Sequence, residues 1–118
     1  MFESLITLGL VLFFCIIAWA LGGSADSLIW GGIALATLGF AYGIPAAIVY
    51  HWRLHRSLMR CGRLPARWWL HPTTLHDLIP REEQTGVLFW GALGGSGFVV
   101  IVIGILLTSI GLWRTLAP

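Results

Sequence analysis

The sequence predicts an all-α polytopic membrane protein with three transmembrane helices and a short cytoplasmic interfacial helix. Two observations predict this fold class: three long uncharged apolar stretches, and the concentration of charge between the last two. The stretches cover residues 5–22, 28–50 and 87–113 of a 118-residue chain. A helix rises about 1.5 Å per residue, so about 20 apolar residues cross a hydrocarbon layer of about 30 Å. Each stretch is near or above that length.

Composition favours a single membrane domain over residues 1–118. Hydrophobic residues make up 58% of the chain and charged residues only 10%, against roughly 25% charged residues in an ordinary soluble domain. A water-facing surface cannot be assembled from so few charges. The net charge of +2 is also too small to indicate nucleic acid, so we expect membrane lipids to be the anionic partner.

The first stretch is expected to be a retained membrane helix. An Ala-Trp-Ala sequence at 18–20 resembles the cleavage site of a signal peptide. The residues before the apolar run contain Glu3 and no basic residue, whereas a signal peptide begins with a positively charged segment. We therefore interpret 5–22 as the first span.

The second helix should begin beside Ser24 or Asp26 and continue beyond its apolar stretch. Either side chain can cap the helix by accepting a hydrogen bond from an amide of the first turn. After residue 50, histidine and apolar side chains recur on one side while arginines occupy the other. Gly62 is the predicted stop, so several turns should project from the membrane. Pro45 should bend the helix because it removes one backbone hydrogen bond.

A cytoplasmic loop over 51–86 is predicted to connect the second and third spans. Its adjacent Trp68 and Trp69 are typical of the membrane surface, where indole rings lie among lipid headgroups. We expect a short interfacial helix within 63–79. Pro80 suits the first position of the third helix, and the two glutamates that follow complement the positive end of its dipole.

Arginine placement predicts the orientation. Six of the seven basic residues lie in the loop over 51–86, and only Arg114 lies elsewhere. The loop should therefore be cytoplasmic, with the N-terminus inside and the C-terminus periplasmic. All the basic residues are arginines, which favours a GC-rich bacterial genome and hence a bacterial inner membrane. The side chains predicted to contact lipid headgroups are Arg53, Arg56, Arg60, Trp68 and Trp69.

Small residues on the second and third helices form stripes that predict close helix contacts. Residues spaced three or four apart share one helix face, where another backbone can approach. Two GxxxG patterns occur, although chance matches are common in glycine-rich membrane sequence. The stripes could pack against each other or against another subunit. The predicted helix-packing residues are Gly32, Ala36, Gly39, Gly43, Gly91, Gly95, Gly97, Gly104 and Gly111.

All four histidines, His51, His55, His71 and His76, lie in the same loop. The first two are four residues apart, a spacing that presents two imidazoles from one helix face to a single metal ion. The alternative, which we favour, is packing and headgroup contact, with hydrogen bonds to carboxylates such as that of Asp77. No cofactor is therefore expected, and a metal or haem held by these histidines is the alternative.

The sequence carries no catalytic signature of high specificity. It has no GxSxG motif, and the three spans contain no ionisable Asp, Glu, Lys, Arg or His, which proton pumps and ion-coupled carriers require. We expect a small accessory or structural subunit, not an enzyme, that packs through its glycine faces against other integral membrane subunits or against itself. The alternatives are a metal- or haem-binding membrane protein and a homo-oligomeric pore or carrier.

Overall fold

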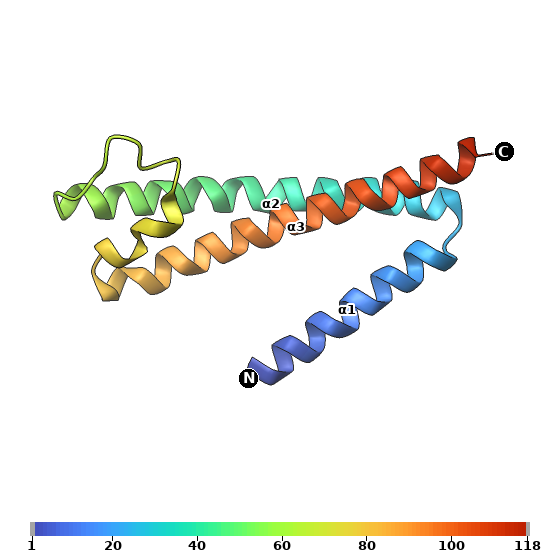
Figure 1. Cartoon of the computed structure of the whole chain (residues 1–118), viewed down its shortest axis with the longest axis horizontal. Helices are drawn as coiled ribbons and strands as arrows, with labels where there is room; N and C mark the ends of the chain where they lie inside the picture. The colour runs from blue at the N-terminus through green and yellow to red at the C-terminus, as the bar shows by residue number, and fades with distance from the viewer. Residues whose placement is uncertain (1, 118) are drawn as a thin grey trace. The chain divides into compact units, whose positions relative to one another are not determined.

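The computed structural model of the protein describes residues 2–117 and is all-helical over that range (Figure 1). Helix α1 covers Phe2–Gly22, α2 covers Ala25–Arg60, the short 3-10 helix η1 covers Pro72–Leu78, and α3 covers Arg81–Leu116. By length and composition, the three α-helices are each apolar enough to cross a membrane. The predicted all-α class with three long apolar helices is therefore confirmed.

Helix α2 continues well beyond its apolar stretch, as the sequence pattern predicts. It is 36 residues long and includes Pro45. Ser24 caps its start, since the Ser27 amide donates a hydrogen bond of 3.2 Å to the Ser24 Oγ atom. After its end, Gly62 adopts a positive φ of 63°, which glycine tolerates because it has no Cβ atom. The Arg63 amide then reaches back to the Leu58 carbonyl oxygen at 3.1 Å and closes the helix end.

The short helix η1 at Pro72–Leu78 lies within the predicted range 63–79, and the two tryptophans before it lie in turns. One detail at the start of α3 differs from the sequence prediction. Pro80 precedes the first residue of α3, and its carbonyl oxygen accepts a hydrogen bond of 2.9 Å from the Glu83 amide. Pro80 is thus the capping residue and not the first helical residue. Its missing N–H is no loss there, because the first amides of a helix have no partner within it.

The chain forms two compact units that share α2 and α3. The described part of unit 1 consists of residues 2–36 and 102–117, and unit 2 consists of residues 37–101. In unit 1 the apolar window of α1 has none of its residues buried. Leu28 and Leu107 are the fully covered leucines of this unit, at 0% and 2% exposure.

The turn between α1 and α2 in unit 1 is held by Trp19 and Arg114. The indole of Trp19 covers Gly23 and Gly31, where a side chain would collide with the ring. Its Nε1 atom donates a hydrogen bond of 3.3 Å to the Ser27 hydroxyl. Arg114 binds carbonyl oxygens at the end of α1, including that of Gly23 at 2.6 Å.

Unit 2 contains the hydrophobic core of the loop. The loop and η1 fold beside the C-terminal end of α2 and the N-terminal end of α3 (Figure 1). They close over a cluster of buried apolar residues, which consists of Tyr50, Leu54, Leu58, Ile79 and Val87. Trp68 and Trp90 are partly buried and pack against this cluster. The loop is therefore anchored by apolar contacts and does not hang freely from the helices.

Candidate functional site

We use the name polar head for residues 50–90 of unit 2. Hydroxyl, carboxylate, guanidinium, imidazole and indole groups lie close together in this segment. The buried stripe of α2 in this region consists of Tyr50, Leu54, Ser57 and Leu58, which follow the i, i+4, i+7, i+8 spacing of one helix face. Trp52 and Met59, which the sequence pattern placed on the apolar face, are instead 57% and 59% exposed. Ser57 takes a place on the buried face because a carboxylate of α3 meets its hydroxyl.

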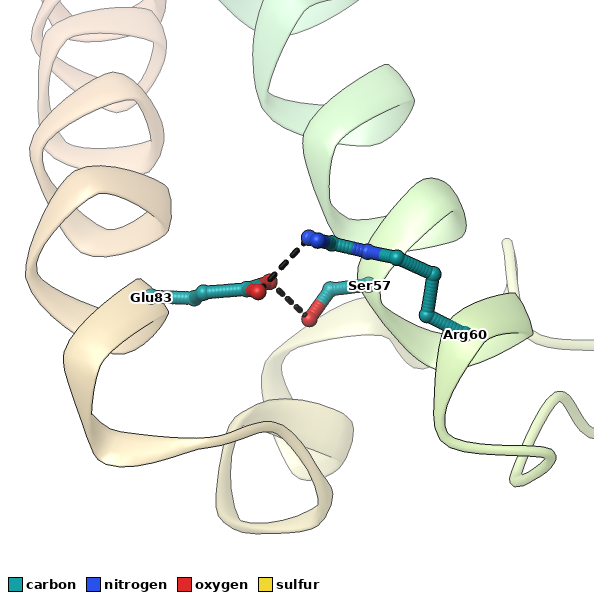
Figure 2. A network of polar contacts seen from close by, with 3 residues as sticks. All are labelled: Ser57, Arg60 and Glu83. Atoms are coloured by element: carbon teal, nitrogen blue, oxygen red, sulfur yellow. Dashed lines mark hydrogen bonds and ion pairs between the residues drawn. The ribbon is translucent and has the colours of Figure 1, made fainter.

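That carboxylate belongs to Glu83, in the first turn of α3 (Figure 2). The Ser57 hydroxyl donates a hydrogen bond of 2.5 Å to Glu83 Oε2, and Ser57 is only 1% exposed. The Arg60 Nη2 atom donates to the other oxygen, Oε1, at 2.6 Å. Both oxygens of one carboxylate are therefore bound by α2. This network fixes the register of the two helices within the polar head.

The histidines of the polar head lie among aromatic rings. The His51 Nδ1 atom is 2.8 Å from the Ala47 carbonyl oxygen, so that nitrogen carries the hydrogen and donates it. The Trp68 ring lies 6.1 Å from the His51 ring and 5.0 Å from the His55 ring, between centroids. The His76 Nε2 atom is 2.7 Å from the Tyr50 hydroxyl.

This arrangement engages the histidines separately. Two of them bond to different partners, a backbone carbonyl and a phenol. His71 is exposed, and its carbonyl oxygen accepts a hydrogen bond from the Thr74 hydroxyl at 2.8 Å. Across residues 2–117, no group of three or more His, Cys, Asp or Glu side chains is placed to hold a metal ion. The hydrogen-bonding partners of the His51 and His76 rings are a backbone carbonyl and the Tyr50 hydroxyl, and not the carboxylates considered from the sequence.

An open groove with a volume of about 520 Å³ lies on the polar head between α2 and α3. We call it the arginine groove, and it is lined by Trp52, Arg53, Arg56, Arg60, Glu82, Glu83, Gly86 and Val87. The Arg53 guanidinium lies 5.8 Å from the centroid of the Trp90 ring, and that of Arg56 lies 5.5 Å from the centroid of the Trp52 ring. Aromatic faces thus hold two of the three guanidiniums.

The predicted interface residues have different environments. Arg60 is bound to Glu83, and Trp68 is partly buried in the polar head. Trp69 is 60% exposed, so most of its side chain is accessible to solvent or lipid. Arg53 and Arg56 line the groove.

The small residues of α2 and α3 contact each other inside each unit. In unit 1, a Cβ atom added to Gly32 would lie 2.5 Å from the Gly104 carbonyl oxygen, and one added to Gly104 would lie 2.5 Å from the Ala36 amide nitrogen. One added to Gly111 would lie 2.7 Å from a side-chain carbon of Ile29. The two backbones are therefore close enough to exclude side chains at these positions.

In unit 2 the same kind of contact joins Gly39 and Gly43 of α2 to Gly97 of α3. The ring of Tyr50 fills the space beside Gly91, at 3.0 Å from the position of an added Cβ atom. Gly95 differs from the others, since nothing lies within 4 Å of that position. Of the predicted packing residues, Gly95 thus has no close contact with another helix among residues 2–117.

Sequence reasoning missed polar contacts, among them those of Ser57 with Glu83, of Tyr50 with His76, and of Arg114 with the end of α1. One signal was available for the first, because Ser57 lies three residues after Leu54 and seven after Tyr50 and so shares their helix face. The partner could not be predicted for any of the three contacts, because the two groups lie 26, 26 and 91 residues apart in the sequence.

No protein-family model, curated protein or solved structure matches this chain.

Proposed function

We propose that this protein is a three-span membrane protein of the bacterial inner membrane that serves as an accessory subunit of a larger membrane complex. The observation that carries the proposal is the contrast between its helices. The apolar window of α1 has no buried residue, while the glycine faces of α2 and α3 contact each other within the chain. The apolar windows of α2 and α3 are 22% and 17% buried, against 0% for α1, so we assign the partner contact to α1.

The internal glycine contacts change which residues are expected to bind a partner. Most of the glycine positions of α2 and α3 face each other at close range, so these faces are already occupied within the chain. Exposed aromatic side chains on α1, such as Phe13 and Phe14 at 57% and 65% exposure, provide large apolar area for contact with another helix. We therefore place the partner contact on α1 and not on the glycine stripes.

The polar head supports a positioning role more than a chemical one. Two of its histidines, His51 and His76, and its buried Ser57 are hydrogen-bonded to partners within the chain. Its groove is open to the surroundings and does not enclose a substrate, whereas small-molecule sites bury most of their ligand. An accessory subunit needs only a stable shape and a lateral contact surface.

Site-specific photo-crosslinking in native membranes tests the proposal. A photoreactive residue at Phe14 of α1 should give one discrete adduct with a larger membrane protein. The same photoreactive residue at Leu106 of α3 serves as the matched control and should give lipid adducts, since Leu106 is exposed as well, at 56% against 65% for Phe14. Adducts of the Phe14 variant with lipid alone, or with a second copy of this chain alone, would overturn the accessory role.

A further inference from the structure

We propose that the arginine groove binds the phosphate group of an anionic phospholipid, with Arg53 and Arg56 as its ligands. The proposal rests on the proposed function only in placing the chain in a membrane. It does not require a partner subunit, so the two can fail independently.

The arginine groove has more positive than negative charge. Three guanidiniums and two carboxylates line it. Arg60 and Glu83 form an ion pair at 2.6 Å and cancel each other. Within residues 2–117, that pair is the one ion pair found, so no carboxylate lies within 4.0 Å of Arg53 or Arg56. Glu82 also lines the groove, which leaves two unpaired guanidiniums against one carboxylate.

The two unpaired guanidiniums, of Arg53 and Arg56, are positioned by tryptophan rings. Each is held by a tryptophan face, Arg53 by Trp90 and Arg56 by Trp52. A cation–π contact uses no hydrogen-bond acceptor, so the N–H groups of both guanidiniums remain available to donate. Because Arg can bind two phosphate oxygens at once, two such side chains on one groove match the oxygens of a single phosphate group.

Gly86 is the third element of the groove. A Cβ atom at this position would lie 3.1 Å from the Arg53 Nη1 atom. The absence of a side chain therefore leaves the space in which the Arg53 guanidinium rests. This glycine offers a way to disturb the site without changing any charge.

The depth of the groove identifies the source of the phosphate. Arg53 and Arg56 follow the apolar part of α2, and Gly86 precedes the apolar part of α3. Trp52 is 57% exposed beside them, and exposed tryptophans concentrate at the headgroup level of a bilayer. A phosphate at that depth belongs to lipid. Basic residues next to a membrane attract anionic lipids by about fivefold each, the equivalent of about 1 kcal/mol.

Counting retained lipids by native mass spectrometry tests the site. The full chain is purified in micelles that contain equal amounts of phosphatidylcholine and phosphatidylglycerol. The test variant is Arg53→Gln with Arg56→Gln, and the matched control is Arg63→Gln with Arg67→Gln, which removes the same charge from the same loop outside the groove. The third variant is Gly86→Ala. Circular dichroism establishes that each variant keeps its helix content.

The unmodified protein and the control should retain phosphatidylglycerol in preference to phosphatidylcholine. The groove variant should lose that preference by about tenfold or more, as the removal of two basic contacts implies. Gly86→Ala should show an intermediate loss. Equal retention by the folded groove variant and the control, whether both are high or both are reduced, would overturn the proposal.

Inorganic phosphate distinguishes the two sources of the same chemistry. Added at millimolar concentration, it should leave the bound phosphatidylglycerol in place, since a free ion lacks the acyl chains that hold a lipid at this depth. Displacement of the lipid by inorganic phosphate would mean that the groove binds phosphate but would contradict lipid as the source of that phosphate. The photo-crosslinking of α1 is unaffected by either result.

Discussion

Arg114, near the end of α3, donates a hydrogen bond of 2.6 Å to the carbonyl oxygen of Gly23, which lies 91 residues earlier in the chain. Its second nitrogen donates to the carbonyl oxygens of Ala20 at 2.7 Å and Leu21 at 3.0 Å. The last carbonyl groups of a helix have no partner within it and carry partial negative charge. One guanidinium of α3 therefore completes the end of α1.

Replacing Arg114 should weaken this junction. Arg114→Gln removes the charge and most of the donors, and because the side chain is exposed we expect a loss of about 1 kcal/mol in the free energy of unfolding. Arg114→Lys keeps the charge but offers a compact donor group that cannot serve three carbonyls together. Denaturant titration in micelles, followed by circular dichroism, measures both variants. If Arg114→Lys is as stable as the unmodified protein, the geometry of the guanidinium is irrelevant and only its charge matters.

Ser57→Ala should destabilise the polar head by about 1–2 kcal/mol, because it removes the donor to a partly buried carboxylate. Arg60→Ala should cost less than about 1 kcal/mol, since the Arg60 side chain is 61% exposed and exposed ion pairs contribute little. The same denaturant titration compares the two. Glu83→Gln provides the control, because it keeps the shape and one acceptor oxygen. The network would lose its structural importance if Ser57→Ala had no effect.

Gly97→Ala and Gly95→Ala form a matched pair on α3. A Cβ atom at position 97 would collide with the Cα atom of Gly43, whereas nothing lies within 4 Å of one at position 95. We expect Gly97→Ala to destabilise the protein by about 1–3 kcal/mol through overpacking. Gly95→Ala should be neutral or stabilising by up to about 1 kcal/mol, because alanine favours helix. Thermal unfolding in micelles measures the difference, and equal effects would refute the backbone contact.

The two cysteines provide a topology test without any substitution. Cys61 is exposed in the loop, and Cys15 is exposed on the apolar helix α1. In a membrane, the Cys15 thiol should lie in hydrocarbon and resist a charged maleimide. Cys61 should react in inverted inner-membrane vesicles and not in intact spheroplasts, because the proposed orientation places the loop in the cytoplasm. Labelling of Cys61 in spheroplasts would reverse the orientation, and labelling of Cys15 would remove α1 from the membrane.

Much of the architecture follows from local sequence signals. The one-sided distribution of arginines after residue 50 predicts the extension of α2, and the structure continues that helix to Arg60. Gly62 ends it because only a residue without a Cβ atom enters the left-handed region at little cost. Both signals act over a few residues, so one sequence is enough to identify them.

The partners of the polar side chains could not be predicted in the same way. Helix periodicity tells which residues share a face, but not which residue of another helix will meet them. His76 was a candidate metal ligand by residue type, yet its Nε2 atom lies 2.7 Å from the hydroxyl of Tyr50. The arginine groove likewise forms only when residues 52–60 of α2 and 82–87 of α3 come together. Such features depend on which residues of α2 and α3 lie opposite each other, and this alignment is set by packing between segments far apart in the sequence.

The lack of buried residues in the apolar window of α1 has a consequence for biogenesis. The described part of the chain leaves the apolar side chains of this helix uncovered, so in a membrane α1 can leave the insertion machinery before the rest of the polypeptide has been translated. Helices α2 and α3 differ, since each needs the other to cover its bare backbone. Synthesis of this chain should therefore pass through a stable single-helix stage, and the helical hairpin should assemble only after the final turn of α3 has emerged from the ribosome.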